Sequence, residues 1–306
     1  MNHGNNLFTI AIISFNVKEK LRTGIESVYR FLPGVPLRIW DNGSTDGTRE
    51  MVMSDYPEIF FYYSSENLFF ARGCNELVAR CTTKYVLLMN ADITLIDASI
   101  AGIADYMETR DDVIAASPSV RDHGQVRHLS SGIITPGLCI ARDSFWGATI
   151  RRGKKYRMAM GDAIDPYSVF DAAKITNCCC MLRRESFCAL GGFSVRQLLY
   201  WTEEDFAVRV NRCGMRQCVF GKSVVEHAHG SSTKKLPAAL VRAIVAHDRI
   251  AYMRFLFGTA SAVLVEMALL RPRFWKSILE YIRYLSKKDE IDRIKRIIAE
   301  YRVTGQ

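Results

Sequence analysis

The chain lacks the features that mark several large classes of protein. No Gly-x-Gly-x-x-Gly motif follows its first apolar segment, because residues 14–17 read Ser-Phe-Asn-Val, and this argues against a dinucleotide-dependent oxidoreductase. The longest uncharged apolar run of the C-terminal part, Gly258–Val265, is far shorter than the roughly 20 residues of a membrane-spanning helix. Residues 1–6 are polar and contain no apolar leader, so we expect a cytoplasmic protein rather than a secreted one.

The nine cysteines contain no Cys-x-x-Cys pair, and in a cytoplasmic protein we expect them to be reduced thiols. Cys178, Cys179 and Cys180 cannot bind one ion together on a strand, because neighbouring side chains point to opposite faces, so we expect them in the core. No zinc-finger spacing or aromatic RNA-binding signature is present, and no nucleic-acid partner is predicted.

The net charge of +9 is concentrated at one end of a chain whose composition is otherwise ordinary for a globular protein. Residues 234–306 hold fifteen Lys and Arg against seven Asp and Glu, which accounts for +8 of the total. A basic tail on a nearly neutral body indicates attraction to an anionic surface such as phospholipid. We therefore predict a catalytic domain over 1–235, with halves of about 1–120 and 121–235, and a helical basic extension over 236–306.

Short apolar segments alternate with helical patterns over the first 120 residues. The expected strands are Phe8–Phe15, Leu37–Asp41, Ile59–Ser64, Tyr85–Asn90 and Val113–Ser117. The expected helices are Lys18–Phe31, Thr45–Ser54, Arg72–Cys81 and Asp97–Arg110. This alternation predicts an α/β fold, with a Rossmann-like, mainly parallel sheet flanked by helices.

Polar residues follow several of the expected strands. Ligands of open parallel sheets bind beyond the carboxyl ends of the strands. Those ends carry Ser14-Phe15-Asn16, the turn Asp41–Ser44, and Asn90-Ala91-Asp92. We therefore predict a binding site at this edge of the sheet.

The second half of the chain is harder to interpret. Residues 121–168 have no firm period and are expected to form functional loops. After them we expect, in order, a strand, two helices, two short strands and a helical tail: Ala173–Leu182, Arg184–Leu190, Glu203–Arg212, Gln217–Phe220, Ser223–Ala228, and then the region beyond residue 235.

Three consecutive acids, Glu203-Glu204-Asp205, open one of these helices. Thr202-x-x-Asp205 also fits a capping box, and Asn90-Ala91-Asp92 also fits a strand-ending turn, so each motif alone has a structural explanation. Together they fit metal-assisted chemistry on a nucleotide diphosphate, in which one carboxylate holds the metal and another accepts a proton.

The ordered set of motifs resembles a family 2 inverting glycosyltransferase of the GT-A fold, in particular its rhamnosyltransferase-like branch, from about Phe8 to Phe255. The segments that carry the resemblance are Ile13–Asn16, Asp41–Thr48, Glu66–Asn75, Asn90–Asp92, Arg183–Glu185, Gly191–Phe193, the acidic cluster, and His227 with Gly230 and Ser232.

The resemblance implies a division of roles among these residues. It implies nucleotide-sugar binding by Ser14, Asn16, Asp41, Asn42, Asn67, Arg72, Asn75 and Asn90, with Asp41 hydrogen-bonded to a pyrimidine. Mn2+ or Mg2+ is expected on Asp92 with His227, and the catalytic base among Glu203, Glu204 and Asp205. The donor is then a dTDP- or UDP-sugar, and the acceptor a glycan or lipid-linked saccharide of cell-surface polysaccharide synthesis.

The chain departs from the family pattern at several positions. Phe69 replaces the glycine expected after Asn-Leu, Asn177 replaces a small residue, and Ser194 replaces an acid. Alignment on Arg209 places Glu203 at the position of the base, whereas alignment on Thr202 places Glu204 there. We prefer Glu203.

Three further questions stay open. A catalytically inactive nucleotide-binding assembly subunit is the alternative function. His227, with His229 on the same face of a strand, fits a metal ligand or a phosphate contact.

The tail carries two apolar stripes that can pack on the domain, pair with a second subunit in a homodimer, or lie on the inner face of an anionic membrane. One stripe consists of Trp275, Ile278, Leu279, Ile282 and Leu285, and the other of Ile291, Ile294, Ile298 and Tyr301.

Overall fold

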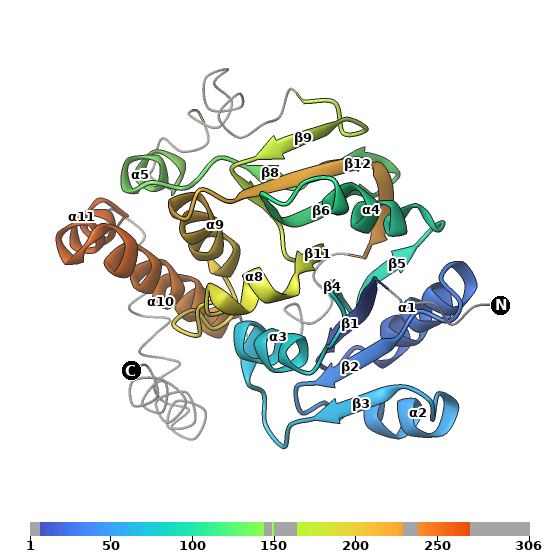
Figure 1. The fold of residues 1–306 in the computed structure, drawn as a ribbon. Coiled ribbons are helices and arrows are strands. Elements are labelled where there is room, and N and C mark those ends of the chain that lie inside the picture. The colour runs from blue at the N-terminus through green and yellow to red at the C-terminus, as the bar shows by residue number, and fades with distance from the viewer. Residues whose placement is uncertain (1–6, 144–148, 150–163, 229–237, 270–306) are drawn as a thin grey trace.

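A computed structural model describes residues 7–143, 149, 164–228 and 238–269 of this protein. Within these ranges a ten-stranded sheet forms the centre, with helices on both of its faces (Figure 1). The path through eight of the strands is β3-β2-β1-β4-β11-β6-β12-β5, while β7 pairs with β6 and β9 with β12. The α/β architecture predicted from the sequence is therefore confirmed.

The first half of the sheet is parallel. Its strands are β1 (Phe8–Ser14), β2 (Leu37–Asp41), β3 (Phe60–Tyr63) and β4 (Tyr85–Asn90). The helices that connect them are α1 (Lys18–Phe31), α2 (Thr48–Asp55) and α3 (Phe69–Ala79). The four predicted strands match to within a residue or so at their ends, because β1 and β4 are buried on both faces and so carry uninterrupted apolar runs.

The second half of the sheet is mixed. Its strands are β5 (Ile93–Leu95), β6 (Val113–Asp122), β7 (Gln125–Arg127), β9 (Val169–Ala172), β11 (Cys179–Arg183) and β12 (Arg216–His227). A separate two-stranded ladder joins β8 (Ser130–Ser131) to β10 (Lys174–Ile175). Because β11 is antiparallel to both β4 and β6, β6 and its parallel neighbour β12 run in the same direction as β4.

Two predictions for this half are corrected by the structure. The single strand expected over Ala173–Leu182 is split, because Lys174–Ile175 pairs with β8 and only Cys179–Arg183 enters the main sheet. The two strands expected over Gln217–Phe220 and Ser223–Ala228 are one strand, β12, whose pairing with β6 is irregular between Phe220 and Val224.

Alternate residues of the strands face two separate core clusters, as the two-residue period of a strand requires. Ile10 and Ile12 of β1 pack with helices α1, α2 and α4 (Gly102–Glu108), the last preceded by η1 (Ser99–Ala101). Ala11 and Ile13 face the opposite cluster, which contains α3, α8 (Arg184–Ala189) and α9 (Thr202–Arg212). Cys178, Cys179 and Cys180 are buried between these layers, as predicted.

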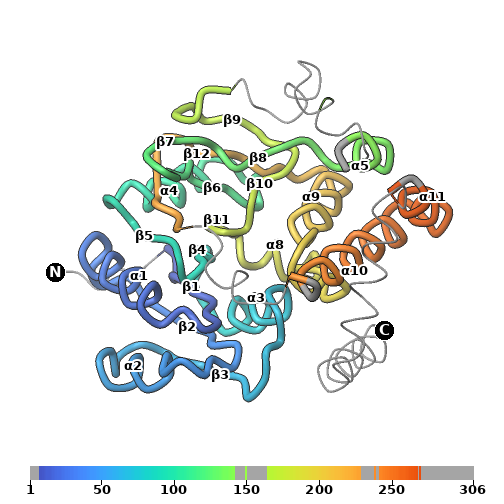
Figure 2. The backbone as a smooth tube through the Cα atoms, turned by 180° about the vertical axis from the view of Figure 1, so that it is seen from behind, coloured from blue at the N-terminus to red at the C-terminus, as the bar shows by residue number. Residues whose placement is uncertain are grey.

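Helices α10 (Ala238–Phe257) and α11 (Thr259–Leu269) form a third packed group with α5 (Pro136–Asp143) and α9. Figures 1 and 2 both show α11 beside α5 and α10 beside α9. Trp201, Val208, Tyr252, Met253 and Val265 are the centre of this group. The apolar stripes predicted beyond residue 270 lie outside the described residues, and none of the described helices is long and apolar enough to cross a membrane.

Candidate active site

The carboxyl ends of β1, β2 and β4 bring three predicted residues to one edge of the sheet. Ser14 lies opposite Asp41 in the register of β1 with β2, and Ile13 lies opposite Asn90 in the register of β1 with β4. The backbone N–H of Asn42 donates to the carbonyl of Ser14 at 2.9 Å and ties the first two strand ends together. Strand direction alone therefore assembles residues distant in sequence into one site.

Asp41 is buried and organises the turn that follows β2. Its two carboxylate oxygens accept hydrogen bonds from the backbone N–H of Ser44 at 2.9 Å and the hydroxyl of Ser44 at 2.5 Å. Burial raises the pKa of Asp41, and the hydrogen bonds from Ser44 oppose that rise. Each oxygen has a further lone pair, so the carboxylate retains capacity for a ligand.

Asn16 connects this turn to the end of β1. Its own N–H donates to the hydroxyl of Ser44 at 2.8 Å, and its side-chain oxygen accepts the N–H of Thr45, also at 2.8 Å. Asn16 has a φ of 55°, a left-handed conformation that Asn adopts more readily than most residues. Asn16 therefore ties the end of β1 to this turn through its backbone and its amide oxygen.

Asn42 and Asn67 hold the segment that leads into α3. The amide of Asn42 accepts from the indole N–H of Trp40 at 3.0 Å and donates to the carbonyl of Phe69 at 3.0 Å. The side-chain oxygen of Asn67 accepts the N–H of Phe69 at 2.8 Å. Phe69 has a φ of 60°, so the loop keeps the left-handed conformation of a glycine although the residue is not glycine.

Two other predicted residues lie on α3, and they do different things. Asn75 forms two hydrogen bonds of 2.8 Å with the backbone of Phe193, one to its N–H and one to its carbonyl. This amide therefore holds the Gly191–Phe193 loop in place. Arg72 is half-buried, and no hydrogen bond or ion pair joins it to another described residue.

Two buried polar atoms at this edge lack hydrogen-bond partners among the described residues. They are the hydroxyl oxygen of Ser14 and the side-chain oxygen of Asn90. An unsatisfied buried polar group costs about 1–3 kcal/mol. A ligand that supplies donors to these atoms recovers that free energy, which favours binding at the ends of β1 and β4.

Asp92 and His227 come together from two strands. The Nε2 atom of His227, at the end of β12, lies 3.3 Å from Oδ1 of Asp92, the residue before β5. Burial lowers the pKa of His227, but hydrogen bonds with Asp92 and Cys178 outweigh burial and raise it to about 9. His229, the second predicted histidine, lies outside the described residues.

The Asp92–His227 pair fits part of the coordination shell of a divalent cation. A carboxylate oxygen and an imidazole nitrogen are both ligands that Mn2+ accepts. Adjacent ligands of an octahedral ion with bonds of about 2.1 Å lie about 3 Å apart, close to the 3.3 Å between these two atoms. The described residues contain no group of three His, Cys, Asp or Glu that could hold a metal.

A short chain of contacts connects this pair to the acidic cluster. The N–H of Asn90 donates to the carbonyl of Cys178 at 2.8 Å. The neighbouring Asn177 donates to the hydroxyl of Thr202 at 3.4 Å. Thr202 in turn donates to Glu203 at 3.0 Å. A few hydrogen bonds therefore link two motifs that stand far apart in the sequence.

Within the acidic cluster, Asp205 is committed to a structural contact. It is fully buried, and one oxygen accepts from Nε of Arg209 at 2.7 Å. Arg209 also donates to the carbonyls of Leu190 and Gly192, at 2.8 Å each. Burial raises the pKa of Asp205, and the charge of Arg209 opposes that rise. The pair therefore fixes α9 to the Gly191–Gly192 turn.

Glu204 also forms an ion pair. Its Oε1 atom lies 2.9 Å from the ammonium group of Lys174, and both side chains are nearly buried. Its second oxygen has no hydrogen-bond partner among the described residues. Lys174 was not predicted as a site residue, although a lysine within an expected buried strand is itself a signal for a paired charge.

Glu203 differs from its two neighbours because no cation of the described residues is bonded to it and it is only half-buried. The hydroxyl of Thr202 donates to its Oε2 atom at 3.0 Å. Burial raises the pKa of Glu203, the charge of Glu204 raises it further, and Lys174 opposes both. A carboxylate with a raised pKa is better suited to accept a proton near neutral pH.

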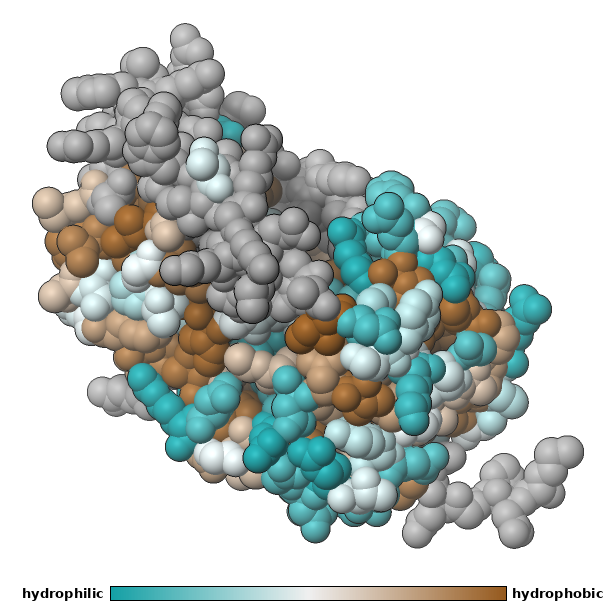
Figure 3. Space-filling view, turned by 90° about the horizontal axis from the view of Figure 1, so that it is seen from above, coloured by the Kyte–Doolittle hydropathy of each residue, from teal (hydrophilic) through white to brown (hydrophobic). Residues whose placement is uncertain are grey.

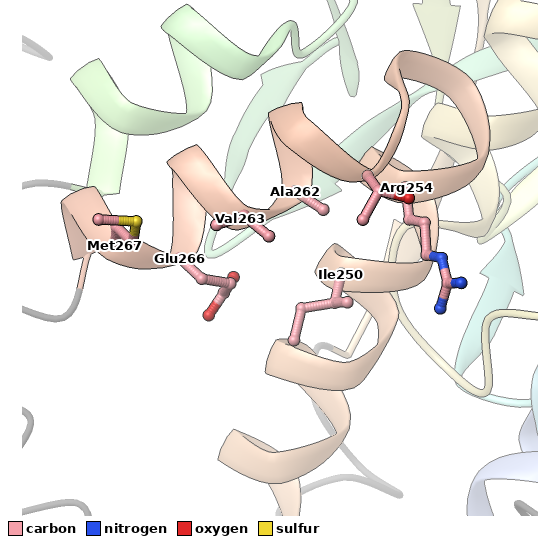
Figure 4. Close-up of a pocket in the computed structure, with 7 residues that line it drawn as sticks. Ile250, Arg254, Ala262, Val263, Glu266 and Met267 are labelled. Carbon is pink, nitrogen blue, oxygen red and sulfur yellow. The ribbon is translucent and has the colours of Figure 1, made fainter.

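A cavity lies away from these residues, between α10 and α11. It has a volume of about 310 Å³ and is lined by Ile250, Arg254, Thr259, Ala262, Val263, Glu266 and Met267. Figure 4 shows Ile250 of α10 and Glu266 of α11 pointing into the space between the two helices. No residue assigned above belongs to this lining, so the cavity is separate from the candidate active site.

Comparison with known proteins identifies a family model and relatives that match this chain. The model of the family described as "Glycosyl transferase family 2" matches residues 9–190. An N-acetylglucosaminyl-diphospho-decaprenol L-rhamnosyltransferase of Mycobacterium tuberculosis, found in strains CDC 1551 / Oshkosh and ATCC 25618 / H37Rv, is 23% identical over 235 residues. The match covers 72% of this chain and 74% of the relative.

Solved structures share the fold. GalNAc-T7 with UDP, GalNAc and Mn2+ superposes with a TM-score of 0.55 at 11% identity. The superposition covers 85% of this chain and 52%, about half, of the GalNAc-T7 chain. The mannosyltransferase PcManGT from Pyrobaculum calidifontis, in complex with GDP-Man and Mn2+, gives a TM-score of 0.52 at 14% identity, over 97% of this chain and 85% of its own. The predicted GT-A fold is confirmed by these similarities.

Proposed function

The chain belongs to glycosyl transferase family 2 and is a glycosyltransferase, and from that premise we propose that it transfers a sugar, with inversion and with a divalent cation, from a nucleoside diphosphate sugar to a lipid-linked saccharide. The observation that carries the mechanism is the difference between the three acids. Asp205 is bonded to Arg209 and Glu204 to Lys174, so Glu203 is the acid that remains to accept a proton.

The donor nucleotide binds at the ends of β1, β2 and β4 in this proposal. The buried, unsatisfied oxygens of Ser14 and Asn90 receive hydrogen bonds from it, and Arg72 faces its phosphates. Asp41 accepts from the N–H of a pyrimidine, which favours dTDP or UDP. Rhamnose is the proposed sugar because the relative from Mycobacterium tuberculosis is named an L-rhamnosyltransferase.

Asp92 and His227 would hold the cation, as their spacing allows. A bound Mn2+ or Mg2+ supplies charge neutralisation for the diphosphate as it leaves. Asn90, two residues before Asp92, orients the sugar-phosphate end of the same ligand, because its amide lies at the end of β4. In this proposal the leaving group lies on one side of the sugar, at the two strand ends.

Glu203 acts on the opposite side. Its carboxylate takes the proton of the acceptor hydroxyl while that oxygen bonds to the anomeric carbon, and the bond to the nucleoside diphosphate breaks with its electron pair. One displacement with one base inverts the configuration, as in inverting glycosidases, where the nucleophile is water. Thr202 orients Glu203 through its hydroxyl.

The acceptor is proposed to be lipid-linked, as the name of the relative indicates for that protein. The surface of α10 and α11 supports this proposal, because Phe255, Val263, Leu264 and Met267 are each about half exposed or more. Figure 3 shows hydrophobic atoms gathered at the end of the molecule where Figure 1 draws these helices. With the basic residues of 234–306, this surface is suited to the inner face of an anionic membrane.

A vesicle experiment tests the membrane part of the proposal. The full-length chain is expected to sediment with anionic vesicles, less so as salt is added, and to remain in solution with neutral ones. The double variant Leu264→Ser and Met267→Ser is expected to weaken the binding. Absence of binding to anionic vesicles at low salt would show that the tail and α11 serve another purpose, such as a homodimer contact.

An activity panel tests the proposed function itself. A thermal-shift screen of dTDP- and UDP-sugars with Mn2+, with Mg2+ and with EDTA is expected to show stabilisation by a matching donor only when metal is present. Release of nucleoside diphosphate on addition of a polyprenyl-diphosphate-linked acceptor then demonstrates transfer. Binding of the donor without any release in the presence of acceptors would favour the alternative, a catalytically inactive assembly subunit.

A further inference from the structure

A buried carboxylate outside the predicted site contacts the loop that leads to Glu203. Asp248 of α10 is fully buried. Its Oδ1 atom accepts the N–H of Leu198 at 2.9 Å, and its Oδ2 atom accepts those of Leu199 and Tyr200 at 3.0 and 2.8 Å. Three successive backbone N–H groups that converge on one anion form the same arrangement that proteins use to bind phosphate and other anions. Here the anion is a side chain of the protein.

The contacted loop has no secondary structure of its own. Residues 195–201 connect the Gly191–Phe193 turn to α9 without a helix or a strand. Backbone N–H groups that are buried without a partner are strongly unfavourable, so such a loop needs acceptors from elsewhere in the protein. The two oxygens of Asp248 accept three of these N–H groups, and Asp248 follows the acidic cluster by some forty residues.

Other contacts from α10 and α3 support the same loop. The ring of Trp201 packs on that of Tyr252 with centroids 5.1 Å apart. The guanidinium of Arg196 lies over the ring of Phe255 at 3.8 Å. On the other side, the N–H of Phe70 donates to the carbonyl of Leu198 at 3.1 Å. The loop is therefore held between the nucleotide-binding half of the domain and α10.

The loop also ends in a constrained conformation. Trp201, directly before α9, has a φ of 64°, which is uncommon for a large residue and is retained only where the surroundings enforce it. Thr202 and Glu203 follow at once. The direction in which Glu203 enters the site therefore depends on where Leu198–Tyr200 are held.

We propose that Asp248 is a positioning residue of the active site, which sets the place of Glu203 by binding the backbone of Leu198–Tyr200. The proposal rests on the proposed role of Glu203 as base. It also assigns a role to α10, because this helix then completes the catalytic centre and is not only an extension of it. His247, whose Nδ1 atom lies 2.9 Å from Oδ1 of Asp248, helps to fix the carboxylate.

The test variant is Asp248→Asn in the full-length chain, which keeps the size of the side chain. An amide offers one oxygen, so whichever way it is oriented its NH₂ group faces at least one backbone N–H of the loop. Hydrogen exchange of the Leu198, Leu199 and Tyr200 amides is expected to accelerate by about tenfold or more, because a charged acceptor is lost. Turnover is expected to fall about 100-fold, since a displacement of the order of 1 Å has that effect, while donor affinity stays unchanged.

Tyr252→Phe is the matched control. It removes a buried hydrogen bond of the same helix, the 2.9 Å bond from the Tyr252 hydroxyl to the carbonyl of Ile134, but keeps the ring on Trp201. This variant is expected to lose stability without losing turnover or the exchange protection of the loop. Equal effects of the two variants on turnover would overturn the positioning role and leave Asp248 as a general stabilising residue.

Two further outcomes would also decide against the positioning role of Asp248. Unchanged exchange at the loop amides in Asp248→Asn would overturn the proposal, and so would accelerated exchange with normal turnover. The exchange measurement does not depend on activity. If the wild-type protein transfers no sugar, the proposed function fails while the loop contact can still be verified, so the two failures are distinguishable.

Discussion

The imidazole of His227 lies 3.3 Å from the carboxylate of Asp92, and the backbone N–H of the next residue, Ala228, donates to the carbonyl of Asp92 at 3.0 Å. The antiparallel pairing of β12 with β5 creates both contacts, because it sets His227 opposite Ile93. A side-chain pair that is fixed by a strand register has little freedom to separate. The strand pairing therefore holds Asp92 and His227 together as a preorganised pair.

Asp92→Ala is expected to abolish the dependence of nucleotide affinity on Mn2+. Changes in groups that only orient metal ligands already lower metal affinity by about 10–100-fold, and removal of a ligand should exceed that. Calorimetry with UDP and dTDP, with Mn2+ and with EDTA, measures the effect. Asp105→Ala removes an exposed carboxylate of α4 away from the site and serves as the control. Unchanged Mn2+-dependent affinity in Asp92→Ala would exclude the assignment.

Glu203→Gln is expected to lower turnover by about 10²–10⁴-fold, the usual contribution of a general base, and to change donor affinity little. Burial and Glu204 raise the pKa of Glu203. As the pH is lowered, the wild-type rate should therefore begin to fall at a higher pH than it would with a base of ordinary glutamate pKa. That acidic limb of the pH profile should be absent from the variant. A normal rate in Glu203→Gln, with a large loss in Glu204→Gln, would transfer the role to Glu204.

Arg209→Met is expected to reduce the free energy of unfolding by about 3–5 kcal/mol, because it leaves the buried carboxylate of Asp205 without its cation. Urea denaturation measures the change. The exposed pair Arg80 and Glu76 has the same i,i+4 spacing, and Arg80→Met should change stability by about 0.5 kcal/mol or less. Similar losses in the two variants would show that burial does not distinguish these pairs.

Phe69→Gly is expected to be more stable than Phe69→Ala by about 1 kcal/mol, since both remove the ring but only glycine adopts a φ of 60° without strain. Thermal or urea denaturation of the two variants gives the difference. A more stable alanine variant would mean that the loop relaxes to another conformation when the ring is absent. In that event Asn42 should lose its hydrogen bond to the carbonyl of Phe69.

The sequence alone determined the first half of the fold. Strands such as Tyr85–Asn90 are buried on both faces, so their apolar runs are visible without any knowledge of their neighbours. It did not determine β10 or the continuity of β12, because these depend on which partner strand is in reach. Residues 121–168 gave no periodic signal, and the structure describes only part of that region.

The sequence also determined which residues were candidates for the site, through the polar residues that follow apolar strands and the acids that open a helix. It could not decide between Glu203, Glu204 and Asp205, because consecutive residues on a helix point in different directions and only their surroundings distinguish them. The tertiary structure separates them by bringing Lys174 to Glu204 and Arg209 into a fully buried contact with Asp205.

Asp248 shows most directly what the sequence alone could not determine. In the sequence it is one acid in a helix of the basic tail, with no motif around it. Its three contacts to Leu198–Tyr200 exist only because α10 packs beside α9. Periodicity reports which face of an element is apolar, since burial acts on every residue of that face. Packing decides which distant backbone a single buried carboxylate contacts, and this contact cannot be inferred from the local sequence.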